Sequence, residues 1–124
     1  MSDDLAAIET AVHTYLDGLY EGDADKLAAV FHPTSSLTYE DKGALKPLPR
    51  DEWLAGVKSR KSAKSQGLPR HDHVLQVDMS GPTTAFVKLK CAIPPRFFTD
   101  YLCFLKVEGK WQVAQKVFTT EMRA

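Results

Sequence analysis

Cysteine is scarce in this sequence of 124 residues, which contains only Cys91 and Cys103. Two cysteines without CxxC spacing are too few for a disulfide framework, and this excludes the small disulfide-rich folds. We interpret both as buried thiols. A hairpin centred near Phe97 would, however, place the two opposite each other on neighbouring strands, and a cross-strand disulfide would then be possible.

An excess of charge of one sign is also absent. Lys plus Arg and Asp plus Glu each number 16, so the formal net charge is zero. The chain as a whole therefore has no field that would attract nucleic acid, acidic lipid or an anionic substrate. The stretch from Lys58 to Arg70 is locally basic, but it lacks interleaved aromatic residues, so we interpret it as a solvated helix face and predict no nucleic-acid partner.

Long hydrophobic runs are missing as well. No apolar run approaches the roughly 18 residues that a membrane span needs. The first residues, Met-Ser-Asp-Asp, have the wrong charge for a signal peptide. We therefore predict a cytoplasmic protein without a membrane partner.

Several catalytic motifs are absent. The chain has no Gly-rich phosphate loop, no Gly-x-Ser-x-Gly and no Cys and His arrangement suited to nucleophilic catalysis. Nucleotide hydrolysis and acyl transfer lose support for this reason. We expect no bound cofactor.

The N-terminal half of the chain has helical patterns. Apolar residues at steps of three and four predict a long amphipathic helix over 3–20. Asp23 is placed to cap a second helix, and Pro33 is placed to end it. A third helix is expected to start near Asp51 and to continue toward Gly67.

The C-terminal half has strand patterns. Strands are predicted at residues 35–39, 72–79, 84–93, 101–107 and 110–118. Glu108-Gly109 forms the two-residue turn of the last hairpin, and the proline-containing segment 40–50 should be a loop or a distorted sheet edge. Helices followed by consecutive antiparallel strands predict an α+β fold. Because the last strands are apolar on both faces, we expect a homodimer through the sheet to cover the face that the helices leave open.

Several segments resemble a known superfamily. A first helix ending in Glu21-Gly22-Asp23, a second ending in Phe31-His32-Pro33, and closing strands with DYL, KVEGKW and KVF are similar to the nuclear transport factor 2-like superfamily. RHDHVLQVDMSG, FFTDYLCFLKVEGKW and QKVF resemble its putative lumazine-binding group. The resemblance implies one domain over 1–124 with a cone-shaped (cystatin-like) fold, an apolar pocket and usually a dimer. It does not imply a reaction, because this fold hosts isomerases, dehydratases, transport adaptors and small-ligand binders.

Tyr15 is the first candidate for chemistry, on the inner side of the first helix. In steroid isomerases of this superfamily, a tyrosine at similar spacing donates a hydrogen bond to the developing oxyanion. The carboxylate base of those enzymes would fall near Tyr39, and a tyrosine cannot serve as that base at neutral pH. A steroid-type isomerase is therefore disfavoured. Alternatively, Tyr15 is a core aromatic with a satisfied hydroxyl.

Asp100, Tyr101 and Lys116 form the sharpest polar group. The turn at Glu108-Gly109 predicts Tyr101 opposite Lys116, with Asp100 beside it. These side chains could orient the polar edge of a ligand, or they could form a structural ion pair. Trp53, from the third helix, is expected to be a pocket wall or part of the core.

The histidines are further candidates. His71 and His73 share one face if the strand has begun by then, and His32 lies at a helix end. With Asp100, the first two could act as acid and base, as dehydratases of this superfamily use histidine and aspartate. They could equally be solvated residues after a turn. No HxxxH or Cys-rich spacing supports a metal, so we predict none.

The leading hypothesis is a homodimeric protein that binds a small apolar or flat heterocyclic ligand in an internal, mostly apolar pocket. The candidate ligand contacts are Tyr15, His32, Tyr39, Trp53, Asp100, Tyr101 and Lys116. The alternative is a lyase or isomerase that works by acid-base catalysis; its candidate catalytic residues are Tyr15, His71, His73 and Asp100. A third possibility is a protein-interaction module that uses the face of its sheet.

Overall fold

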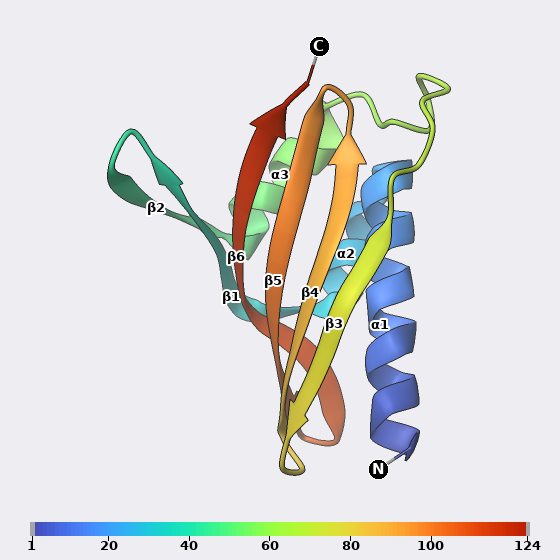
Figure 1. Cartoon of the computed structure of the whole chain (residues 1–124), viewed down its shortest axis with the longest axis vertical. Coiled ribbons are helices and arrows are strands. Elements are labelled where there is room, and N and C mark those ends of the chain that lie inside the picture. Colours follow the sequence, from blue (N-terminus) through green and yellow to red (C-terminus); the bar gives the residue numbers. More distant parts are fainter. Residues whose placement is uncertain (1, 124) are drawn as a thin grey trace.

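The computed structural model describes residues 2–123 and shows three helices packed against one face of a six-stranded sheet (Figure 1). The helices are α1 (Ser2–Glu21), α2 (Ala24–Val30) and α3 (Arg50–Ser59). The strands are β1 (Phe31–Asp41), β2 (Ala44–Pro49), β3 (His73–Ser80), β4 (Thr84–Ile93), β5 (Arg96–Val107) and β6 (Lys110–Met122). We call the face that carries the helices the inner face and the opposite one the outer face. The α+β architecture predicted from the sequence is confirmed.

The helices arise where the periodic pattern predicted them. Helix α1 turns one apolar side to the sheet, with Ile8 and Tyr15 fully buried. The side chain of Asp23 caps α2 by accepting hydrogen bonds from the backbone N–H groups of Asp25 and Lys26. Among residues 2–123, no helix is long and apolar enough to cross a membrane.

Two predicted helix ends are wrong. Helix α2 stops at Val30, and Pro33 lies within β1, because the fully buried Phe31 already pairs with β6 as a strand residue. Helix α3 stops at Ser59 and does not reach Gly67. The residues after Ser59 are mostly polar and basic, so a longer helix would bury little apolar surface to offset its ordering entropy.

The sheet has the order β2-β1-β6-β5-β4-β3. Strand β1 pairs with β6 in parallel, which the strand patterns did not predict, and the other neighbouring pairs are antiparallel. Segment 40–50, predicted as a loop or distorted edge, contains the edge strand β2, where Pro47 and Pro49 remove ladder donors at little cost.

The β5–β6 hairpin contains a β-bulge that changes its register. Between the turn and Phe104, the strands pair in the register that a two-residue turn predicts. Beyond that point Ala114 is unpaired, and the register shifts by one residue. The prediction that Tyr101 lies opposite Lys116 is therefore wrong, since Tyr101 pairs with Val117.

The bulge decides which way Lys116 points. A shift of one residue exchanges the two faces of a strand. Lys116 pairs with Leu102, which is fully buried, so both lie on the inner face. Asp100 is two residues from Leu102 on the same face, whereas Tyr101 points outward.

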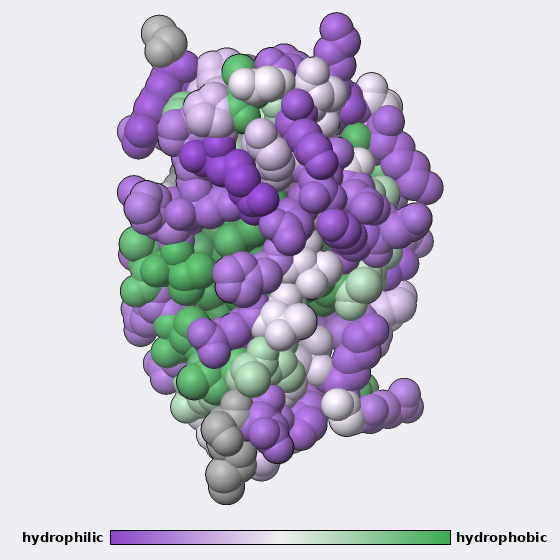
Figure 2. Space-filling model, turned by 90° about the vertical axis from the view of Figure 1, so that its right-hand side faces the viewer, coloured by the Kyte–Doolittle hydropathy of each residue, from purple (hydrophilic) through white to green (hydrophobic). Residues whose placement is uncertain are grey.

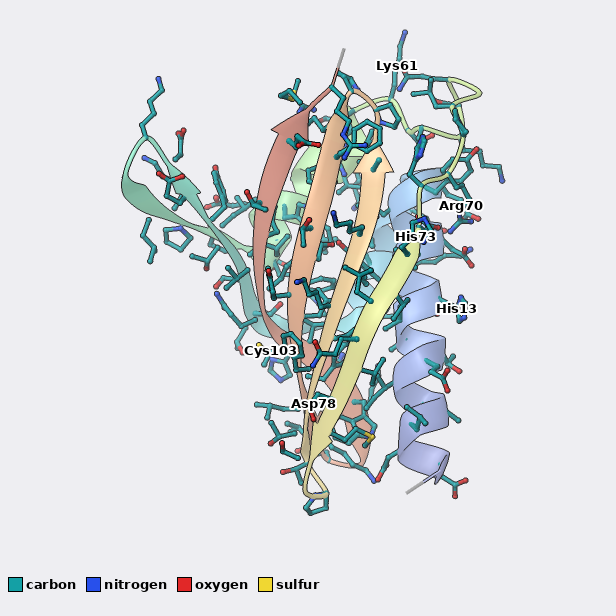
Figure 3. The ribbon with its side chains drawn as sticks, in the orientation of Figure 1. His13, Lys61, Arg70, His73, Asp78 and Cys103 are labelled. Carbon is teal, nitrogen blue, oxygen red and sulfur yellow. The ribbon has the colours of Figure 1, made fainter. Side chains whose placement is uncertain are left out.

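The two cysteines lie apart. The β4–β5 hairpin turns at Pro94-Pro95, because consecutive prolines cannot donate to a ladder, and not at Phe97. Cys91 therefore pairs with Phe98 rather than with Cys103. Cys91 is buried as predicted, but Cys103 is exposed on the outer face (Figure 3), so the prediction of two buried thiols is wrong for the second.

Asp4 joins the start of α1 to the β5–β6 hairpin. Its Oδ1 accepts hydrogen bonds from Trp111 Nε1 and from Lys106 Nζ, each at 3.0 Å. The hydrogen bond from Trp111, and to a smaller extent that from Lys106, holds the pKa of Asp4 below its usual value. A carboxyl group with a lower pKa in the folded state stabilises the fold above its unfolded pKa of about 4, and this contribution is lost as the pH falls through the folded pKa.

The Asp4→Asn variant is accordingly expected to lose less stability than the wild type as the pH is lowered below about 4. Urea unfolding across the acid range measures this slope. Asp3→Asn, which changes an exposed carboxylate in the same turn, is the matched control and should retain the wild-type slope. If the two variants have the same acid dependence, the assignment of Asp4 is contradicted.

Gly18 lies where α1 approaches α2. A Cβ atom at this position would lie 3.0 Å from Leu27 Cδ2 and 3.1 Å from Lys26 Cβ. Gly18→Ala is expected to destabilise the fold by about 1–3 kcal/mol through overpacking. At Gly56 in α3 no atom lies within 4 Å of the added Cβ, so Gly56→Ala should stabilise by about 0.5–1 kcal/mol through helix propensity. Chemical denaturation of both variants tests this, and equal shifts would refute the close contact at Gly18.

Candidate functional site

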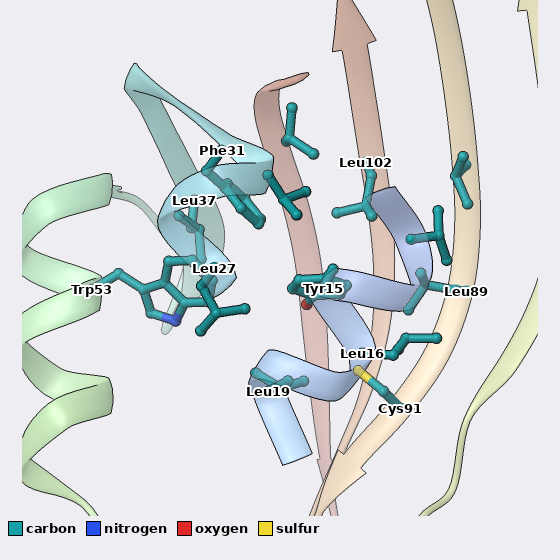
Figure 4. Close-up of a cluster of buried hydrophobic side chains, with 14 of the residues drawn as sticks. Tyr15, Leu16, Leu19, Leu27, Phe31, Leu37, Trp53, Leu89, Cys91 and Leu102 are labelled. Carbon is teal, nitrogen blue, oxygen red and sulfur yellow. The ribbon is translucent and has the colours of Figure 1, made fainter. Parts of the chain in front are cut away.

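Three polar side chains from three elements meet inside the core. Tyr15 comes from α1 and lies at the centre of the buried cluster (Figure 4), while Asp100 comes from β5 and Lys116 from β6. The Tyr15 hydroxyl donates to Asp100 Oδ2 at 2.5 Å, and Lys116 Nζ donates to the Tyr15 hydroxyl oxygen at 2.8 Å. Lys116 Nζ also lies 3.7 Å from Asp100 Oδ2. We call these three residues the polar triad.

The polar triad is sealed from solvent. The exposed fraction is 0% for Tyr15 and Asp100 and 4% for Lys116. The thiol of Cys91 lies 3.5 Å from Asp100 Oδ2, whereas Asp100 Oδ1 has no hydrogen-bond partner among the described residues. Buried polar atoms are normally paired. The triad therefore retains a free acceptor in a place where an unpaired oxygen is costly.

Burial keeps the Tyr15 phenol and the Cys91 thiol in their neutral forms. It raises the pKa of the Tyr15 phenol well above its usual value near 10, and the charge of Asp100 raises that pKa further. Tyr15 therefore remains a neutral donor at physiological pH. Burial first and Asp100 second also raise the pKa of the Cys91 thiol, which makes it a poor nucleophile.

Aromatic rings cover the ammonium end of the triad. Lys116 Nζ lies 4.6 Å from the ring centroid of Phe118 and 5.4 Å from that of Trp53. The Phe118 ring in turn packs against Tyr39 at 5.2 Å and Phe98 at 6.2 Å between centroids. Trp53 is buried, but the other three rings are half-buried. We call Tyr39, Phe98 and Phe118 the aromatic rim, which lies between the triad and solvent.

Most residues predicted to contact a ligand come together here. Tyr15, Tyr39, Trp53, Asp100 and Lys116 form or adjoin the polar triad.

Two predicted ligand contacts lie elsewhere. Tyr101 is on the outer face, where Lys88 Nζ lies 5.3 Å from its ring centroid. His32 is hydrogen-bonded to Thr34 and lines a small pocket of about 230 Å³ beside Leu105.

The predicted catalytic residues do not form one site. His73 pairs with Lys90 at the start of β3 (Figure 3), and the His71 ring packs edge-on against Phe97 at 5.0 Å on the outer side of the sheet. The sheet separates both histidines from Tyr15 and Asp100. Within residues 2–123, no three His, Cys, Asp or Glu side chains gather as a metal site would require.

Sequence reasoning missed three neighbours of the triad: Cys91, Phe98 and Phe118. Phe98 lies two residues before Asp100, and Phe118 lies two residues after Lys116, so each shares the inner face with its neighbour. The period of two along a strand was the available signal. Cys91 was identified only as a buried thiol, since its contact with Asp100 depends on the position of the β4–β5 turn.

Chemically, the triad combines an ammonium, a neutral phenol and a carboxylate. The ammonium has further N–H groups that can donate to a carbonyl oxygen or a ring nitrogen, whereas the one phenol proton is already donated to Asp100 Oδ2. Asp100 Oδ1 can accept a hydrogen bond from an N–H or O–H group. In a site with little water, such hydrogen bonds are stronger than in bulk solvent.

Residues 3–119 match the model of a family described as "Putative lumazine-binding". The chain is 24% identical over 119 residues to aldolase FrzH from a Cladobotryum species, covering 94% of this chain and 91% of that protein. Two similar solved structures are an NTF-2 like protein of unknown function from Silicibacter pomeroyi and a ketosteroid isomerase-like protein from Erwinia carotovora atroseptica. The first structure has a TM-score of 0.83 and is 24% identical, covering 97% of this chain and 98% of that one. The second has a TM-score of 0.75 and is 18% identical, covering 99% of this chain and 100% of that one. The structural likeness shows an NTF2-like fold, and from the family match we conclude that the chain belongs to the putative lumazine-binding family.

Proposed function

We propose that the protein binds a small, flat, largely apolar molecule at the aromatic rim, with the polar edge of that molecule directed at the polar triad. The observation that carries this proposal is the Tyr15 hydroxyl held between Lys116 and Asp100 beneath partly exposed aromatic rings. The unpaired Asp100 Oδ1 adds an acceptor for a ligand N–H group. The family description names one such heterocycle, lumazine.

Thermal-shift screening with lumazine, riboflavin, a pterin and a steroid tests this proposal. A ligand that binds only the folded state stabilises it by RT ln(1 + [L]/Kd), so the midpoint of unfolding rises with the logarithm of the free ligand concentration above Kd. The heterocycles are expected to raise the midpoint in the wild type, and less in Phe118→Ala, which removes part of the rim. If none of these compounds shifts the midpoint at saturating concentration, the proposal fails.

A second candidate function is acid-base catalysis on a carbonyl compound. It is favoured by the neutral Tyr15 next to the carboxylate of Asp100, and by the names of two similar proteins, an aldolase and a ketosteroid isomerase-like protein. Tyr15 and Lys116 would stabilise an enolate oxygen, and Asp100 would exchange the proton at the adjacent carbon. The test is exchange of the α-protons of a bound ketone with deuterated water, followed by NMR. Exchange that is as fast in Tyr15→Phe as in the wild type would eliminate this function.

The outer face supports a further part of the proposal, a homodimer through the sheet. Tyr101, Leu105, Val107 and Val117 are 37–46% exposed on this face. Figure 2, a view toward β3 and α1, shows hydrophobic surface gathered on one side of the molecule. Exposed apolar area of this kind is typical of protein contacts. A second copy of the chain is the partner that we propose.

Light scattering measures the oligomeric state. The wild type is expected to have twice the monomer mass, and Leu105→Lys should shift it toward the monomer by placing a charge in the contact. Lys58→Gln, at an exposed position of α3 away from this face, should leave the mass unchanged. A wild-type monomer would favour instead a contact with a different protein.

A further inference from the structure

A pocket of about 430 Å³ lies on the outer face, separate from the polar triad. A row of four residues crosses the strands β3, β4, β5 and β6, and each is the register partner of the next. These residues are His73, Lys90, Thr99 and Thr119. Residues paired in register point to the same side of a sheet. Thr99 is the neighbour of Asp100 along β5, and neighbouring residues of a strand point to opposite faces. Because Asp100 is on the inner face, the side chains of this row point away from the helices.

An aromatic ring forms one wall of this outer pocket. Phe97 lies two residues before Thr99 and therefore on the same face. The guanidinium carbon of Arg123 lies 4.3 Å from its ring centroid, and the His71 ring packs against its edge at 5.0 Å. Phe97 thus holds a cation and a histidine at the margin of the pocket.

The charges of the outer pocket favour an anion. Its one lining carboxylate among the described residues, Glu121, is in an ion pair with Arg123 at 2.5 Å. Lys90 has no carboxylate oxygen within 4.0 Å among residues 2–123. The histidines and threonines add N–H and O–H donors. The pocket therefore combines an uncompensated cation with several hydrogen-bond donors.

We propose that the outer pocket binds a small organic anion, a molecule with one carboxylate or phosphate group on an apolar body. Lys90 contacts the oxyanion, donors from His73 and Thr119 complete its coordination, and the Phe97 wall supports the apolar body. The volume lies in the range of small-molecule sites. The row of side chains that would hold the oxyanion points away from the aromatic rim, although Cys91 and Phe98 also border this pocket.

Titration of the 124-residue chain with phenyl phosphate and phenylacetate, followed by amide NMR shifts, tests the proposal. At least one probe is expected to cause saturable shifts at Thr99 and Thr119. Lys90→Gln should weaken that binding by at least about tenfold through loss of a charge-assisted contact. Lys88→Gln is the matched control: it lies on the same strand and face but over the Tyr101 ring, and it should change Kd by less than about twofold.

Four results would overturn the proposal. The first is that neither probe gives saturable shifts up to about 10 mM. The second is equal weakening by Lys90→Gln and Lys88→Gln. The third is binding of inorganic phosphate as tight as that of phenyl phosphate, because the Phe97 wall would then contribute nothing. Shifts confined to the aromatic rim would also contradict this site while supporting the inner one.

Discussion

Replacement of Asp100 by leucine is expected to destabilise the fold by about 3–5 kcal/mol, because it leaves the Lys116 ammonium buried without a carboxylate. Lys116 is 4% exposed, so water cannot take the place of that partner. Lys116→Met should cost a similar amount by leaving Asp100 as an uncompensated charge.

The double variant Asp100→Leu with Lys116→Met is expected to recover much of this loss. Removing both charges removes both desolvation penalties, and apolar replacements for buried ion pairs are often nearly neutral. The two effects should therefore be non-additive by at least about 2 kcal/mol in urea unfolding. Asp78→Leu, at an exposed position of β3, is the control and should change stability by less than about 0.5 kcal/mol. Additive losses would show that the two charges do not stabilise each other.

The second large effect is expected at Phe31, the buried residue that begins β1. Its ring centroid lies 5.6 Å from that of Tyr15 and 4.8 Å from that of Trp53, and the residue is 0% exposed. Phe31→Ala should destabilise the fold by about 3–5 kcal/mol through lost burial and the cavity left behind. It should also lower affinity at the aromatic rim, since the Tyr15 and Trp53 rings lose their support.

Unfolding by urea measures the cost of Phe31→Ala, and Leu45→Ala provides the comparison. Leu45 is 73% exposed near the tip of the β1–β2 hairpin, so its truncation should change stability by less than about 0.5 kcal/mol. A loss below about 1 kcal/mol for Phe31→Ala would contradict the packing described for this core.

Local patterns in the sequence were enough to predict the helices and most strands. The three- and four-residue spacing identified α1, and the hairpin around Glu108-Gly109 emerged as β5 and β6. These features depend on neighbours in the chain. The parallel pairing of β1 with β6 depends on how distant segments pack, and no local pattern reports it.

The candidate site was only partly predictable for the same reason. The interaction of Asp100 with Lys116 was predicted, but the predicted strand register would have placed the two side chains on opposite faces of the sheet. The bulge at Ala114, an unpaired residue without a glycine or proline to mark it, corrects their orientation. His71 and His73 were predicted to share a face if the strand had begun by His71, but β3 begins at His73, so that condition is not met.

The two faces of the sheet therefore carry different chemistry. The inner face has a buried network beneath aromatic rings, and the outer face has an apolar area next to a cationic pocket. Overall neutrality concealed the second feature, because a net charge of zero does not prevent local concentration of cations.

Titration calorimetry with lumazine measures most directly whether a ligand binds at the aromatic rim through the polar triad. Tyr15→Phe removes one hydroxyl from the triad, while Tyr101→Phe removes one from the outer face at a position next to Asp100. The wild type is expected to bind lumazine saturably, and the affinity should be weakened about three- to tenfold by Tyr15→Phe and unchanged by Tyr101→Phe. Absence of binding, or equal affinities for Tyr15→Phe and the wild type, would contradict this mode of binding.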